Sequence, residues 1–86
     1  MSNKRILKRN INEMVFDVVE ECFHHQMLDE SKAPATEKLI TEAASFQDVI
    51  LGRMHKAKGK AEFRAIVAEV EAKALTFVDA LNALNK

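Results

Sequence analysis

Apolar residues recur along this chain at spacings of three and four, which is typical of one buried stripe on an α-helix. The first stripe predicts a helix over residues 3–30. Its members are Leu7, Ile11, Val15, Val18 and Cys22. His25 lies at the edge of this stripe, so we expect it in the core or at an interface.

Two further stripes predict helices over residues 34–57 and 60–85. Pro34 suits the first turn of the second helix, because its missing N–H would have no partner there. The second stripe comprises Leu39, Ala43, Phe46, Ile50 and then Met54 or Ala57. The third comprises Phe63, Val67, Val70, Ala74, Phe77, Leu81 and Leu84. Its 3.5-residue period is typical of left-handed bundle packing.

These segments predict an all-α fold, an antiparallel three-helix bundle that runs up-down-up as one domain over residues 1–86. With two glycines, one proline and no Tyr or Trp, the composition favours helices over strands. Short connections bring the start of the first helix, the end of the second and the start of the third to one end. Two of the expected layers are Val18 with Phe46 and Val70, and His25 with Leu39 and Phe77.

One other architecture stays open around Gly59. An alanine-rich stripe runs through this glycine and would also suit a single long helix in place of the second and third. Its members are Ile50, Met54, Ala57, Ala61, Ala65, Ala68 and Ala72. We favour a break, because glycine inside a helix costs about 1 kcal/mol relative to alanine and is a common left-handed cap.

The net charge of zero conceals a strong polarity. Residues 1–12 and 53–64 together hold nine basic residues and one acidic residue, whereas the rest holds four basic and twelve acidic residues. The nine are Lys4, Arg5, Lys8, Arg9, Arg53, Lys56, Lys58, Lys60 and Arg64. Since the predicted topology brings both segments to the same end, we expect an electrostatic docking surface there.

Three partners suit such a basic end: nucleic-acid phosphates, an acidic protein, or the acidic end of another copy. The nucleic-acid hypothesis lacks support elsewhere, because the chain has no Tyr or Trp for base stacking and no recognisable helix-turn-helix. A basic surface that serves only solubility is the plain alternative.

The first predicted helix carries more apolar surface than a three-helix bundle can cover. Beside its core stripe it presents a second apolar set, Phe16, Val19, Phe23 and Met27. The later helices add Ile40, Leu51, Ile66, Leu75 and Val78 outside their main stripes. We expect a homodimer through the first helix; the alternative is a wider monomer core or isolated surface residues.

Residues that could carry chemistry are few. Glu21 and His24 have the Glu-x-x-His spacing of carboxylate-bridged di-iron bundles, but the later helices hold no second such pair. Cys22 lies in the predicted core, so we expect an inert thiol. No phosphate loop, nucleophile elbow or catalytic carboxylate pair occurs. We therefore expect neither an enzyme nor a bound metal or cofactor.

The remaining expectations concern location and role. No apolar run is long enough to span a membrane, and a single cysteine fits the reducing cytoplasm. The sequence thus predicts a small cytoplasmic protein whose role is protein–protein interaction or assembly. The second hypothesis is a nucleic-acid-associated accessory protein that uses the basic end.

Overall fold

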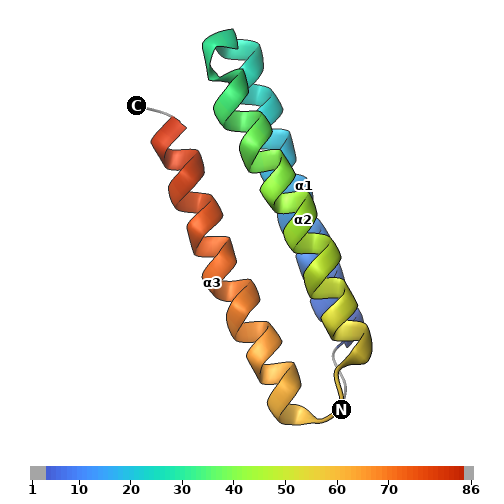
Figure 1. Ribbon diagram of the computed structural model, residues 1–86. Helices are drawn as coiled ribbons and strands as arrows, with labels where there is room; N and C mark the ends of the chain where they lie inside the picture. Colours follow the sequence, from blue (N-terminus) through green and yellow to red (C-terminus); the bar gives the residue numbers. More distant parts are fainter. Residues whose placement is uncertain (1–3, 85–86) are drawn as a thin grey trace.

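The computed structural model describes residues 4–84 and is all-α (Figure 1). Its elements are α1 (Lys4–Leu28), the short 3-10 helix η1 (Glu30–Lys32), α2 (Ala33–Lys56) and α3 (Lys60–Leu84). The three long helices agree with the sequence prediction. The expected helix ends at residues 3 and 85 lie outside the described residues, as do the outermost residues of the expected domain.

The first helix ends earlier than expected, at Leu28 instead of residue 30. Asp29 causes the change: its Oδ1 accepts hydrogen bonds from the Ser31 backbone N–H at 3.0 Å and from the Ser31 hydroxyl at 2.6 Å. A side chain that satisfies local backbone groups in this way competes with helix continuation. Residues 30–32 therefore form η1, and α2 follows directly with Pro34 in its first turn.

The break at Gly59 rules out one long second helix. α2 ends at Lys56, and Gly59 has φ +88, a backbone conformation that other residues rarely adopt. α3 begins at Lys60, and the Phe63 N–H donates to the Gly59 carbonyl at 3.3 Å. The glycine thus allows the chain to turn between two separate helices.

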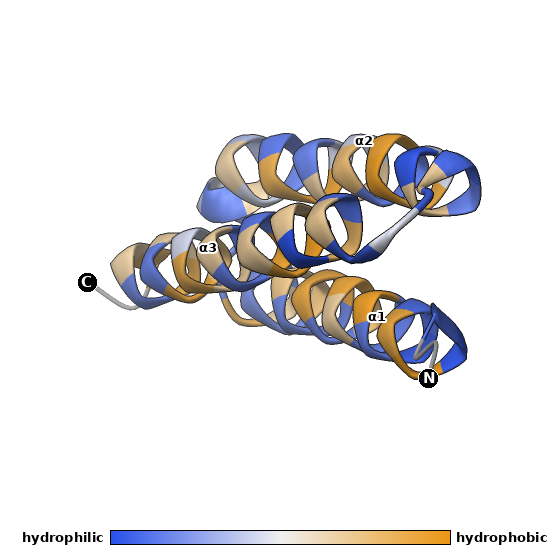
Figure 2. Cartoon of the chain, turned by 90° about the horizontal axis from the view of Figure 1, so that it is seen from below, coloured by the Kyte–Doolittle hydropathy of each residue, from blue (hydrophilic) through white to orange (hydrophobic). Residues whose placement is uncertain are grey.

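Contacts between distant residues show how the helices lie together in a molecule of 45 × 17 × 16 Å. The Lys4 Nζ donates to the Ala57 carbonyl at 3.0 Å, so the start of α1 lies beside the end of α2. The Lys32 Nζ donates to the Leu84 carbonyl, which ties the start of α2 to the last turn of α3. Cations at the carbonyl ends of helices are electrostatically favourable. Figure 2 shows the three helices and the apolar residues along them.

The core confirms the stripe predicted for α1, since Leu7, Ile11, Val15, Val18, Cys22 and His25 are all buried. On α2 the predicted residues are buried except Phe46, which is half-buried. α2 also buries Thr36, which the apolar pattern did not indicate. The Thr36 hydroxyl is placed to donate to the Lys32 or Ala33 carbonyl and accepts from the Gln26 amide, so burying it leaves no unpaired polar atom.

The predicted stripe of α3 faces the core, since Val70 and Phe77 are buried and its other members are half-buried. The helix is rotated slightly from the predicted orientation. Ile66, expected outside the main stripe, is only 2 % exposed, whereas Val67 of the predicted stripe is half-buried. This rotation buries the longer isoleucine side chain in place of valine, which removes more apolar surface from water.

The lengthwise position of α3 also differs from the predicted layers. Phe77 was expected beside His25 and Leu39. Instead its ring packs edge to face on Phe46, with centroids 6.2 Å apart, and it shares a groove with Val18. α3 is therefore displaced toward the Gly59 turn, and its C-terminal end stops short of the α1–α2 turn (Figure 1).

Candidate functional site

The strongest candidate site is the apolar set on the outside of α1, which we call the α1 outer face: Phe16, Val19, Phe23 and Met27. Phe16 is 64 %, Phe23 53 % and Met27 84 % exposed. Val19 is half-buried and packs against the core. Helix geometry explains the alignment, because the spacings of three and four place the four side chains on one side of α1.

These four residues line one shallow groove together with Glu20 and His24. A groove of apolar side chains with a polar rim has the make-up of a protein interface core and its border. The sequence predicted the four apolar members. It did not indicate the rim, because a single polar residue beside an apolar stripe has no distinctive pattern.

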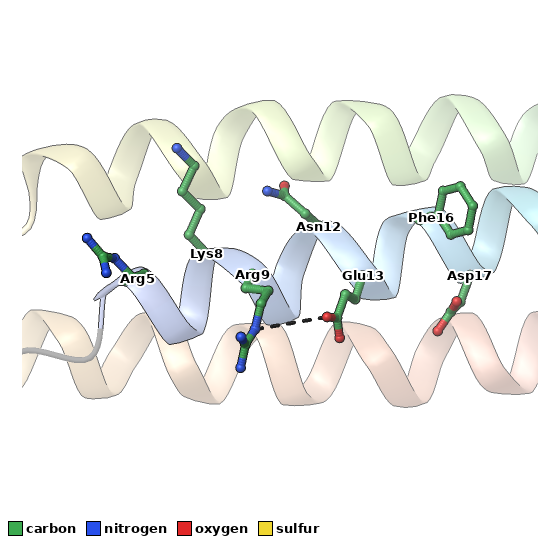
Figure 3. A pocket seen from close by; sticks show the side chains of 7 residues that line it. All are labelled: Arg5, Lys8, Arg9, Asn12, Glu13, Phe16 and Asp17. Carbon is green, nitrogen blue, oxygen red and sulfur yellow. Dashed lines mark ion pairs between the residues drawn. The ribbon is translucent and has the colours of Figure 1, made fainter.

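The basic residues of α1 lead into this face from the start of the helix. Arg5, Lys8, Arg9, Asn12 and Glu13 line a second open groove that ends at Phe16 and Asp17 (Figure 3). Figure 3 shows Lys8, Asn12 and Phe16 along one edge of α1, and Arg9, Glu13 and Asp17 along the other. The outside of α1 is thus basic in its first half and apolar in its second.

The edge of α1 that carries Asn12 is bonded to α2, whereas the edge that carries Arg9 has an ion pair within α1. Asn12 accepts a hydrogen bond from the Gln47 amide of α2 at 2.8 Å, which fixes the middle of α1 to its neighbour. Arg9 forms an ion pair with Glu13 at 4.0 Å, one helical turn away, and both side chains are about two-thirds exposed. Exposed pairs of this kind contribute only about 0.2–1 kcal/mol, so Arg9 can exchange Glu13 for another anion.

The nine basic residues are distributed over different grooves and turns. Lys4, Arg5 and Lys8 line a groove between α1 and α2 that also includes Leu51, Met54 and His55. Arg53 and Lys56 line a different groove, between α2 and α3, with Glu62 on its wall. Lys58 lies in the Gly59 turn, and Lys60 and Arg64 are exposed in the first turns of α3.

Several members of this basic end already have partners within the chain. Lys4 holds the Ala57 carbonyl, and Arg53 forms an ion pair with Glu69 of α3. The Lys58 backbone N–H donates to the Glu62 carboxylate at 3.4 Å. Of these contacts, the Arg53–Glu69 ion pair offsets a positive charge. The Lys4 bond to a neutral carbonyl and the Lys58 backbone bond leave both ammonium charges in place.

The remaining chemical groups form no recognisable site. Burial, with a smaller effect from the Glu21 charge, raises the pKa of the Cys22 thiol, so it stays protonated at neutral pH and is a weak nucleophile. Among residues 4–84 no three His, Cys, Asp or Glu side chains gather as potential metal ligands, and the Glu21–His24 pair has no further ligand beside it.

Comparison with known protein families, with curated proteins and with solved structures gives no match for this chain. Within the described part of the chain, no helix has both the length and the hydropathy needed to cross a bilayer. The α1 outer face and the basic end are therefore the features that indicate a function.

Proposed function

We propose that this protein is a small non-enzymatic assembly module, an up-down-up helical bundle that forms a homodimer through the α1 outer face. The observation that carries the proposal is the exposure of Phe16, Phe23 and Met27 side by side along one groove. Contiguous apolar surface of this kind is typical of interaction sites, whereas single exposed apolar residues are common on any protein.

The energetics favour association. Fully burying one large apolar side chain contributes about 1.5–3 kcal/mol, and a symmetric dimer buries each member of the α1 outer face twice. The sum is comparable with the cost of association, which is about 4–15 kcal/mol. Since the four side chains are already partly buried in the single chain, the remaining gain offsets much of this cost, and contacts at the rim of the face add to it.

A second copy is the occupant that best fits the charges around the face. The face lies between the basic start of α1 and the acidic turn with Asp29 and Glu30, and all three regions are exposed. A copy of the same chain offers matching apolar surface and both signs of charge, which supports self-association.

Charge substitution on the face tests the proposal. We expect Phe16→Glu with Phe23→Glu to convert the dimer to a monomer, because the dimer would bury four unpaired carboxylates. Light scattering gives the mass, and circular dichroism establishes that the variant stays folded.

The matched control is Leu75→Glu with Val78→Glu on α3. These side chains are 68 % and 52 % exposed, close to the values for Phe16 and Phe23. The control should remain dimeric. If the α1 variant is folded and its mass equals that of the unchanged protein, the proposed interface is wrong.

A nucleic-acid-associated role is the second candidate. The groove between α1 and α2 favours it, since three cationic side chains, Lys4, Arg5 and Lys8, line it. Phosphate binding would weaken steeply with salt, and replacing Arg5 and Lys8 by Gln would abolish it. Absence of binding to a short DNA or RNA duplex at about 50 mM salt removes this candidate. Binding of an acidic protein is tested with the same variants.

The cytoplasm is the compartment we propose for the protein. Cys22 is a buried free thiol, and free thiols persist in reducing compartments.

A further inference from the structure

The outside of α1 and the turn that follows it have a consistent order of charge and hydrophobicity. Arg5, Lys8 and Arg9 lie at one end, the α1 outer face follows, and Asp29 and Glu30 lie at the other end. Hydrogen bonds from Ser31 lower the pKa of the Asp29 carboxyl, so this group is ionised at neutral pH. The two exposed ends are therefore of opposite sign across the apolar face.

We propose that the two copies of the dimer join with their α1 helices antiparallel, so that the basic start of each α1 lies near the acidic turn of the other. This inference rests on the proposed self-association through the α1 outer face and adds its orientation. It also assigns a ligand to the basic residues of α1, namely the carboxylates of Asp29 and Glu30 in the second copy.

Two simple symmetric pairings lay the face on itself, a parallel one and an antiparallel one. The apolar set spans positions 16 to 27, with its midpoint between residues 21 and 22. In a parallel pair each residue lies beside its own copy, so Arg9 meets Arg9 and Glu30 meets Glu30. In an antiparallel pair Phe16 lies against Met27 of the second copy, and Val19 lies against Phe23.

The antiparallel arrangement brings opposite charges within reach. In this register Glu13 lies nearest the α1–α2 turn of the second copy, and its ion-pair partner Arg9 lies one helical turn away, about 6 Å further along the axis. An arginine side chain spans that distance. Apolar burial would set the affinity, whereas the charges would select the orientation, since like charges placed together oppose binding.

Cysteine cross-linking tests the orientation. In a Cys22→Ala background, Phe16→Cys and Met27→Cys are made singly and together, and Glu20→Cys, near the midpoint, serves as the dimer control. Disulfides need Cα atoms about 4.4–6.8 Å apart. In an antiparallel pair two copies of position 16 lie about 16 Å apart along the axis, whereas positions 16 and 27 are opposite each other.

We expect the double variant to form covalent dimers under mild oxidation, and both of its single variants to remain uncrosslinked. Two copies of position 20 lie about 4.5 Å apart along the axis, so Glu20→Cys should be joined by a short bifunctional thiol cross-linker. Efficient cross-linking of Phe16→Cys and Met27→Cys as single variants would show a parallel dimer and overturn the orientation alone. A monomeric mass with no cross-link at position 20 would instead overturn the proposed self-association.

Charge reversal provides a second readout that leaves the apolar face unchanged. In a Glu13→Gln background, which removes the carboxylate nearest position 30 of the second copy, Arg9→Glu and Glu30→Arg should each raise the dimer dissociation constant about fivefold, and combining them should restore the original value. Sedimentation measures the constant, and the melting temperature of each variant controls for folding. A double variant no better than the single ones would contradict the antiparallel contact.

Discussion

On α3, side chains of similar size contribute very different amounts to the free energy of folding, because some face the core and others face water. Ile66 is enclosed between the helices, whereas Leu75 is largely in water. Only the first loses its hydration on folding, so only the first contributes the full hydrophobic free energy.

We expect Ile66→Ala to lower the free energy of unfolding by about 2–5 kcal/mol, because it removes buried methyl and methylene groups and leaves a cavity. Leu75→Ala should change it by no more than about 0.5 kcal/mol. Urea unfolding followed by circular dichroism measures both. Equal losses for the two variants would mean that Ile66 is not in the core.

Asp29 has a pH-dependent role in the α1–α2 turn. Its hydrogen bonds from Ser31 favour the carboxylate and lower its pKa from the ordinary value of 3.8. A group whose pKa is lower in the folded state stabilises that state at pH values above its unfolded pKa. The contribution is lost as the pH falls through the lowered value.

Replacing Asp29 with alanine should therefore lower the melting temperature at pH 7, and the difference should shrink as the pH falls below 3.8. Glu30→Ala is the control, since it removes the same charge from the same turn but keeps the Asp29–Ser31 bonds. Melting curves between about pH 2 and pH 7 measure the effect. A difference that does not vary with pH would contradict this role for the Asp29 carboxylate.

At the scale of elements, the two glycines have opposite effects on the helices. Gly52 lies inside α2, and a Cβ at this position would meet nothing within 4 Å. Gly59 also has open space around it, but its φ of +88 strains any side chain. One glycine thus weakens a helix, and the other makes the turn between two helices possible.

Alanine substitution separates these effects. Gly52→Ala should raise the free energy of unfolding by about 0.5–1 kcal/mol through better helix propensity. Gly59→Ala should lower it by about 1–2 kcal/mol, the cost of a left-handed backbone with a Cβ. Thermal unfolding of both variants shows whether each substitution stabilises or destabilises the fold. A stabilising Gly59→Ala would mean that the chain does not turn with positive φ there.

The sequence predicted some elements better than others for physical reasons. The buried stripe of α1 was correct because it runs along most of the helix from Leu7, whereas the second apolar set begins only at Phe16. α3 has apolar residues over a broad arc, so Ile66 and Val67 compete for the core. Only packing against Phe46 and the other helices decides between them. Thr36 was missed because threonine is polar and does not count toward an apolar stripe. Its burial is possible only because the fold supplies hydrogen-bond partners for its hydroxyl.

Of the two candidate surfaces, one could be predicted from the sequence and the other could not. The excess apolar surface on α1 was predictable, because counting apolar positions on one helix needs no knowledge of its neighbours. The arrangement of the basic end was not, since Lys4 and Arg53 have partners at Ala57 and Glu69. Such contacts depend on where helices that are distant in sequence come to lie.

At the scale of the whole molecule, charge and exposed apolar surface are both distributed unevenly along an elongated shape. A protein with no net charge has little long-range repulsion between copies. Opposite charges at its two ends, with apolar surface between them, favour association of copies in a defined orientation.

The most direct test of this account is the mass of the unmodified protein in solution, measured by light scattering at about 50 mM and about 500 mM salt. We expect twice the chain mass of 9.7 kDa at both salt concentrations, since the proposed dimer is held by apolar burial. A monomer at micromolar concentration in both conditions would contradict self-association through α1.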